Sequence, residues 1–110
     1  MREIPLQETP NQELETVINS TVFNIRLHTI REMTVADVYI NRQLICAGVR
    51  CVPGMPLIPL RYIADTVGNF YFSCLDANYP YYELFNASQR LLYLSPSEIA
   101  AERASRAIGG

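Results

Sequence analysis

The sequence predicts a mainly β protein: a small antiparallel β-barrel or sandwich followed by a short C-terminal helix. Apolar and polar residues alternate along several short segments, and turn residues separate these segments about every eight to twelve positions. Helix signals gather at the end of the chain. A chain of 110 residues has room for one modest core. We therefore expect a β domain over residues 1–94 and a helical extension over residues 95–110.

The first half of the chain carries the strongest strand pattern. Short strands are expected over residues 3–6 and 13–18, on either side of a Pro-Asn turn. Residues 22–52 then form three alternating runs that polar pairs at 31–32 and 41–42 interrupt. Period-two alternation is typical of half-buried strands, and such short breaks are typical of hairpins. The pattern predicts a three-stranded meander.

The second half is less regular. After the Pro53-Gly54 turn, residues 55–60 contain two prolines. Proline cannot donate to a strand ladder, so this segment is expected to be an edge strand or a loop lying against the sheet. A single helical turn is expected over residues 62–65 and strands over 70–75 and 90–94, whereas residues 81–85 fit either state.

The C-terminal helix has a clear start signal at Ser95-Pro96-Ser97-Glu98. Serine caps a helix and proline suits its first position. The side chain of a glutamate at the third position can accept a hydrogen bond from the backbone N–H of the capping residue. The apolar face is mostly alanine, with Ile99 and Ile108. A helix of about three turns is marginal alone in water. We expect it either to dock on a neighbouring surface or to fray.

Charge and hydropathy exclude several classes of protein. Eleven acidic residues outnumber nine basic ones, and every basic residue is arginine. A protein that neutralises nucleic-acid phosphates usually shows a basic face, so nucleic-acid binding is disfavoured. Arginine suits protein interfaces, although genome composition can produce the same bias. The N-terminus has no apolar run typical of a signal peptide, and no segment has the length of a membrane span. We expect synthesis in the cytoplasm.

No catalytic or metal-binding constellation is visible in the sequence. The single histidine, His28, is predicted on the polar face of a strand, and Glu13 and Glu15 share a solvated face. Glycines occur singly rather than in a phosphate-binding cluster. Asp76 and Asn78 have a spacing seen in calcium loops, but no further acid follows. We expect no enzyme activity, no cofactor and no metal.

The cysteines are expected to be free, buried thiols. No Cys-x-x-Cys spacing is present, so a zinc site is disfavoured. Cys46 and Cys51 are five positions apart on one predicted strand, which predicts that their side chains point to opposite faces. Cys74 lies on another predicted strand.

Aromatic residues give the clearest functional signal. Four of the seven tyrosines lie between residues 71 and 82, and the stretch 70–85 contains no Lys or Arg. Tyrosine is enriched at protein interfaces, whereas single-stranded nucleic-acid sites combine aromatic platforms with basic residues. Ordinary core packing is a further explanation. The predicted protein interface comprises Tyr71, Tyr79, Tyr81, Tyr82, Met55, Leu57 and Ile99.

Several short motifs occur in an order that resembles a known family. They are Ile4-Pro5-Leu6, Pro10-Asn11-Gln12, Ala47-Gly48, Val52-Pro53-Gly54-Met55-Pro56-Leu57, Gly68-Asn69-Phe70-Tyr71-Phe72 and Leu92-Tyr93. Over residues 3–94 the chain is similar to the small baseplate plug proteins of contractile-tailed phages, including those of cyanophage. Each motif alone is only a good turn or strand, and the match depends on their order.

The resemblance implies a structural protein of the virion, in the tail baseplate near the central hub or spike. It implies several copies, assembled in the host cytoplasm, that contact hub, spike, sheath-initiator or wedge proteins and each other. It implies no enzyme activity and no cofactor. The helix after Ser95 would be an extension beyond the common core, and its alanine-rich face suggests the hypothesis that it clamps a neighbouring subunit. The alternative is a small β-barrel module that binds single-stranded nucleic acid.

Overall fold

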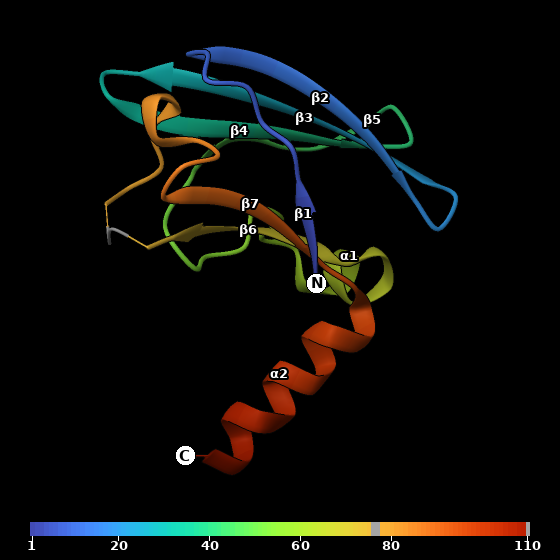
Figure 1. Cartoon of the computed structure of the whole chain (residues 1–110). Coiled ribbons are helices and arrows are strands. Elements are labelled where there is room, and N and C mark those ends of the chain that lie inside the picture. Colours follow the sequence, from blue (N-terminus) through green and yellow to red (C-terminus); the bar gives the residue numbers. More distant parts are fainter. Residues whose placement is uncertain (76–77, 110) are drawn as a thin grey trace.

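Two antiparallel sheets face each other in the computed structural model, which describes residues 1–75 and 78–109 (Figure 1). The larger sheet has the order β2-β3-β4-β5, formed by β2 (Asn11–Ile18), β3 (Thr21–Ile30), β4 (Met33–Ile40) and β5 (Gln43–Arg50). The smaller sheet has the order β1-β7-β6, formed by β1 (Arg2–Ile4), β7 (Gln89–Leu94) and β6 (Asn69–Cys74). The two sheets do not close into a barrel. The predicted mainly β fold is confirmed, and of its two forms the sandwich fits.

Tight turns build the larger sheet. The pairs Asn19-Ser20, Arg31-Glu32 and Asn41-Arg42 connect successive strands, and all six residues have φ between 48 and 68°. Two consecutive residues with positive φ form the turn whose twist matches that of a hairpin. The predicted meander is therefore confirmed, and β2 adds a fourth strand to it.

The core lies between the two sheets because each inner face is apolar. Phe23, Ile25 and Leu27 of β3 point inward, and Phe70 and Phe72 of β6 meet them from the smaller sheet. The rings of Phe23 and Phe70 pack edge to face, with centroids 5.1 Å apart. Such pairs add about 0.5–1.5 kcal/mol beyond the burial of their area.

The proline-rich segment after residue 52 is a loop that lies along the edge of β6. The Gly54 N–H donates to the Phe72 carbonyl at 3.0 Å, and the Leu57 N–H donates to the Phe70 carbonyl at 2.9 Å. The buried Asn69 side chain accepts from the N–H of Ile58 and donates to its carbonyl, both at 2.9 Å. The loop therefore occupies the edge that β6 would otherwise expose.

Two short helical segments follow the predicted positions. Helix α1 (Arg61–Val67) extends the expected single turn, and the ambiguous stretch at 81–85 contains the 3₁₀ turn η1 (Tyr82–Leu84). Helix α2 (Pro96–Gly109) begins as predicted: Glu98 N–H donates to Ser95 Oγ at 3.3 Å, and Glu98 Oε1 accepts from Ser95 N–H at 3.0 Å. Among the described residues, neither helix has the length and apolar character needed to cross a membrane.

Helix α2 docks at its beginning and then projects from the sandwich (Figure 1). Ile99 in its first turn is buried, and Arg103 one turn later forms an ion pair with Asp65 of α1. The described first turns are thus attached to the chain's own domain. Gly110, the end of the predicted helix, lies outside the described residues.

The predicted opposition of Cys46 and Cys51 is wrong. Cys51 is a core residue, and Cys46 also packs against the core. The pairing of β4 with β5 shifts between Ala36 and Val38, and Gly48 opposite this shift has a φ of +66°. A bulge inserts an extra residue and breaks the alternation, so parity along the sequence no longer decides which face a side chain takes.

Candidate functional site

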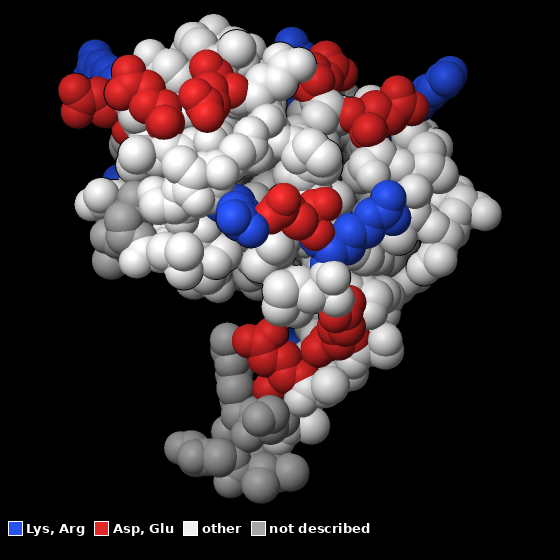
Figure 2. Space-filling model, viewed as in Figure 1, with Lys and Arg blue, Asp and Glu red and all other residues white. Residues whose placement is uncertain are grey.

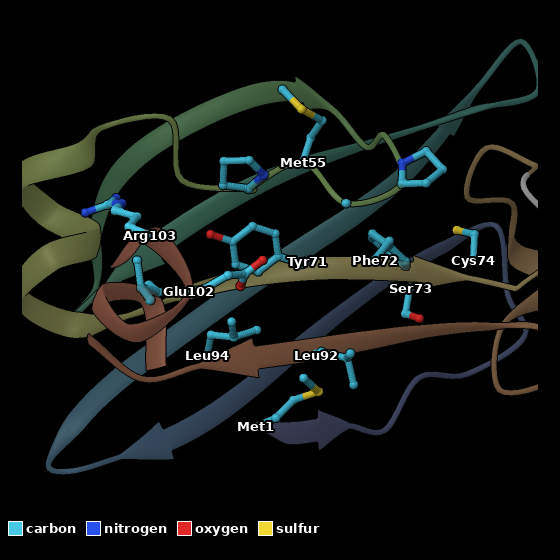
Figure 3. A pocket seen from close by; sticks show the side chains of 14 residues that line it. Met1, Met55, Tyr71, Phe72, Ser73, Cys74, Leu92, Leu94, Glu102 and Arg103 are labelled. Carbon is cyan, nitrogen blue, oxygen red and sulfur yellow. The ribbon is translucent and has the colours of Figure 1, made fainter. Parts of the chain in front are cut away.

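An apolar groove lies on the outer face of the smaller sheet (Figure 3). Its volume is about 580 Å³, and its walls come from β6 and β7, the loop at 53–56, the N-terminal residue and α2. It is lined by Met1, Pro53, Gly54, Met55, Pro56, Tyr71, Phe72, Ser73, Cys74, Leu92, Leu94, Ile99, Glu102 and Arg103. Segments from both ends of the chain and from its middle therefore build one surface.

Strand alternation explains why this outer face is apolar. Along β6, Phe70 and Phe72 are buried while Tyr71 between them is only half-buried. Leu92 has the same position on β7 and pairs with Tyr71 across the ladder. Side chains of opposed residues in an antiparallel pair lie on the same face, so Tyr71 and Leu92 together form part of the groove floor.

The loop and the helix complete the walls. Met55 projects from the loop and is 56% exposed, and Ile99 of α2 is 4% exposed at the groove. In Figure 3 Met55 lies above Tyr71, while Glu102 and Arg103 of α2 lie at one end of the groove. An apolar floor with charged groups at one end suits an apolar segment of another protein better than a charged ligand.

The structure brings together three of the seven predicted interface residues, namely Met55, Tyr71 and Ile99. Leu57 is instead 1% exposed and packs in the core. The Leu57 N–H donates to the Phe70 carbonyl and the Leu57 side chain packs in the core, so the loop does not keep strand alternation between Met55 and Leu57. The loop thus presents one apolar residue outward and buries the other.

The other three tyrosines of the predicted interface lie away from the groove. Tyr81 and Tyr82 have ring centroids 4.7 Å apart, and the Arg50 guanidinium lies 4.7 Å from the centroid of the exposed Tyr79 ring. None of these three tyrosines lines the groove. The sequence cluster therefore divides in space, with Tyr71 on one surface and the other three near β4 and β5.

Leu92, Leu94 and Met1 line the groove but were absent from the predicted interface. A signal for the two leucines was present: residues 91–94 are Leu-Leu-Tyr-Leu, an apolar run without alternation. A continuous apolar run indicates a strand covered on both faces. This run could therefore have predicted that the outer face of β7 is covered or binds a partner.

The outer face of the larger sheet is polar. His28 Nε2 lies 3.1 Å from Asp37 Oδ2, and Asp37 Oδ1 accepts a hydrogen bond from Gly48 N–H at 2.8 Å. The Gly48 N–H first, and His28 beside it, lower the pKa of Asp37. The Asp37 carboxylate thus connects the β5 bulge to β4. The residue beside His28 therefore has a structural role.

A shallow polar hollow of about 320 Å³ also lies on this face. It is lined by Glu13, Glu15, Asn24, Arg26, Tyr39 and Arg42. Among the described residues, no group of three or more His, Cys, Asp or Glu side chains is arranged to hold a metal ion. Asp76, one member of the calcium-like spacing, lies outside the described residues.

Comparison with known proteins identifies the family. No curated protein matches the chain. A family model described as cyanophage baseplate Pam3 plug gp18 matches residues 1–96, which include every strand of both sheets and end at the first residue of α2. The resemblance seen in the turn motifs is confirmed. The chain belongs to the cyanophage baseplate plug family, whose members are structural components of the virion tail.

Proposed function

We propose that this protein is a plug near the central hub or spike of a contractile-tail baseplate and acts through protein–protein contacts. Its partners would be hub, spike, sheath-initiator or wedge proteins and further copies of itself, and assembly would take place in the host cytoplasm. Catalysis and a cofactor have no part in this proposal. Family membership supports a place in the baseplate, and the apolar groove supports action through protein–protein contacts.

The groove is the observation that carries the proposal. Met55 leaves more than half of its side chain in water, beside Tyr71 and Leu92. Burying one such side chain fully against a partner contributes about 1.5–3 kcal/mol. A few buried side chains of this kind near the centre of an interface carry most of its binding energy.

Helix α2 supplies a second contact in this proposal. Beyond Ile99, the described part of the helix exposes Ala100, Ala101 and Ala104. Small side chains allow another backbone to approach closely, so the projecting helix would clamp a neighbouring subunit. Removal of residues 95–110 should weaken assembly. Ala101→Glu is a milder test because Ile99 and the cap at Ser95 stay intact.

The first experiment is mass spectrometry of purified tailed particles from the phage that encodes this chain. Peptides of the chain are quantified against the sheath protein. We expect a low, fixed ratio that corresponds to a small multiple of three copies per particle. Absence of the chain from well-purified particles would overturn the proposal.

The groove is tested by a pair of matched substitutions. Met55→Glu places a charge at the groove mouth, and Leu44→Glu places one on β5, where Leu44 is 51% exposed and does not line the groove. We expect Met55→Glu to reduce incorporation into particles by about tenfold or more, the equivalent of about 1.4 kcal/mol. Leu44→Glu should leave incorporation unchanged. Equal effects of the two variants would argue against the groove as the contact surface.

A further inference from the structure

Strand β2 forms a long, regular edge of the larger sheet. It pairs with β3 without interruption from Asn11↔His28 to Ile18↔Thr21, and it is the terminal strand of that sheet. A two-residue hairpin turn is closed by a hydrogen-bonded pair, here Ile18 and Thr21, and bonded pairs then recur at every second residue. The backbone N–H and C=O groups of Glu13, Glu15 and Val17 therefore point away from β3.

The other edges of the two sheets are less suited to pairing. The loop at 53–57 lies along β6, β1 has only three residues, and β5 is irregular opposite Ala36 and Val38. Short strands, bulges and covering loops are the usual protections of sheet edges. β2 has eight residues and contains no proline, glycine or bulge, so its edge is the one open to an added strand.

The side chains at this edge specify the charge of an added strand. Glu13 and Glu15 share the outer face, and Val17 on the same face is 56% exposed. Within residues 1–75 and 78–104, whose side chains the structure describes, the ion-pair partner of Glu13 is the exposed Arg26, with Nε at 3.8 Å, and such pairs contribute little. Among the described residues Glu15 has no ion pair, and its cross-strand neighbour is Asn24. Figure 2 shows acidic side chains along the upper rim, over the larger sheet.

The same charges oppose pairing with a second copy of β2. In an antiparallel pair centred on Leu14, each Glu13 would lie opposite the Glu15 of the other copy. A pair centred on Glu15 would place the two Glu15 side chains opposite each other. Like charges directly opposite across a ladder are destabilising, so these two registers are disfavoured, and a strand with basic residues fits the edge better than a second copy of β2.

We propose that the edge of β2 binds an extended strand of a partner protein, antiparallel to β2, with basic residues opposite Glu15 and Glu13 and an apolar residue opposite Val17. Backbone bonds from residues 13, 15 and 17 give the affinity, and the alternate charges give the register and the choice of partner. The inference deepens the proposed function by specifying the chemistry of one partner. It is tested on the isolated protein, so its failure would leave the particle experiments unaffected.

The probe is the capped peptide acetyl-Thr-Val-Thr-Arg-Thr-Arg-Thr-amide, added to the ¹⁵N-labelled full chain. We expect amide NMR shifts at β2 that saturate with peptide, and slower hydrogen exchange at Glu13, Glu15 and Val17. Glu15→Arg should weaken binding by about tenfold or more, the equivalent of about 1.4 kcal/mol. Glu83→Arg, a matched exposed site on η1, should leave binding unchanged.

Val17→Pro separates the backbone contribution from the charge, because it keeps both Glu13 and Glu15. It removes the N–H that points to the free edge without removing a bond to β3, so binding should be lost while the β3 amides keep their shifts. A peptide with both arginines replaced by glutamate should not bind. Equal binding of the two peptides, unchanged binding to Glu15→Arg, absence of shifts at β2 at millimolar peptide, or dimerisation of the protein through β2 would each overturn the inference.

Discussion

Gln89 holds the tyrosine loop from inside the protein: its Oε1 accepts the backbone N–H of Tyr81 at 2.8 Å. Its Nε2 donates to the carbonyl of Tyr79 at 3.0 Å, and the side chain is completely buried. A buried amide can only replace its lost water contacts with bonds of this kind. One side chain of β7 therefore positions the backbone of the loop that carries Tyr79 and Tyr81.

Replacement of Gln89 by leucine should destabilise the fold by about 1–3 kcal/mol, because the Tyr81 N–H and the Tyr79 carbonyl lose their partner. Chemical denaturation of the purified protein measures the change. Gln43→Leu at an exposed position of β5 is the control and should change stability by less than about 0.5 kcal/mol. Similar midpoints for Gln89→Leu and the wild type would contradict the anchoring role.

Two glycines with positive φ should respond differently to alanine. A Cβ at Gly68, where φ is +96°, would lie 2.5 Å from the Leu94 carbonyl oxygen, whereas a Cβ at Gly54, where φ is +73°, meets nothing within 4 Å. Gly54→Ala should cost about 1 kcal/mol from backbone strain alone. Gly68→Ala should cost at least about 3 kcal/mol, because β7 must also shift. Thermal unfolding of both variants checks the order, and equal losses would show that the backbone contact is easily relieved.

Cysteine reactivity should follow burial. Burial first, and the nearby Cys74 second, raise the pKa of Cys51 to about 12, and the thiol is fully buried. Since the thiolate is the nucleophile, iodoacetamide at pH 8 should modify half-buried Cys46 and Cys74 before Cys51. Peptide mapping by mass spectrometry gives the order, and denatured protein, in which all three thiols should react alike, is the control. Rapid modification of Cys51 in folded protein would contradict the structure.

Acid should weaken the β5 bulge. The pKa of Asp37 is lowered in the fold, chiefly by the Gly48 N–H, so the carboxylate contributes stability above its unfolded pKa of about 3.9. That contribution is lost as the pH falls through the lower folded value. Asp37→Asn should therefore be less stable than the wild type at pH 7, and the difference should shrink below about pH 4. Denaturation at both pH values tests this, with Glu83→Gln as the matched surface control.

The regular elements were predictable because short-range patterns determine them. Alternation and polar pairs located the hairpins of residues 22–52, and the Ser95 to Glu98 spacing located the start of α2. These features depend on neighbours within a few positions. Gly48 was a local signal, because an isolated glycine inside a strand pattern suggests a bulge or turn. The change of face between Cys46 and Cys51 was not predictable, because it depends on how β5 pairs with β4.

The residues of the groove were predicted only in part. Tyr71, Met55 and Ile99 were predicted as interface residues on composition, and the fold brings them onto one surface although they come from three different elements. The tyrosine cluster, in contrast, divided, because alternation along β6 sends Tyr71 outward while Gln89 positions Tyr79 and Tyr81 elsewhere.

The sequence by itself determined the β class, the hairpin turns, the helix cap and, through the order of its turn motifs, the family. Only the tertiary structure decided that the sheets form a sandwich, that Leu57 is buried while Met55 is exposed, and that the β2 edge is the open one. The physical reason is the distance along the chain over which each effect acts. Propensity and alternation act between neighbours along the chain, whereas burial and edge protection depend on which distant segments pack together.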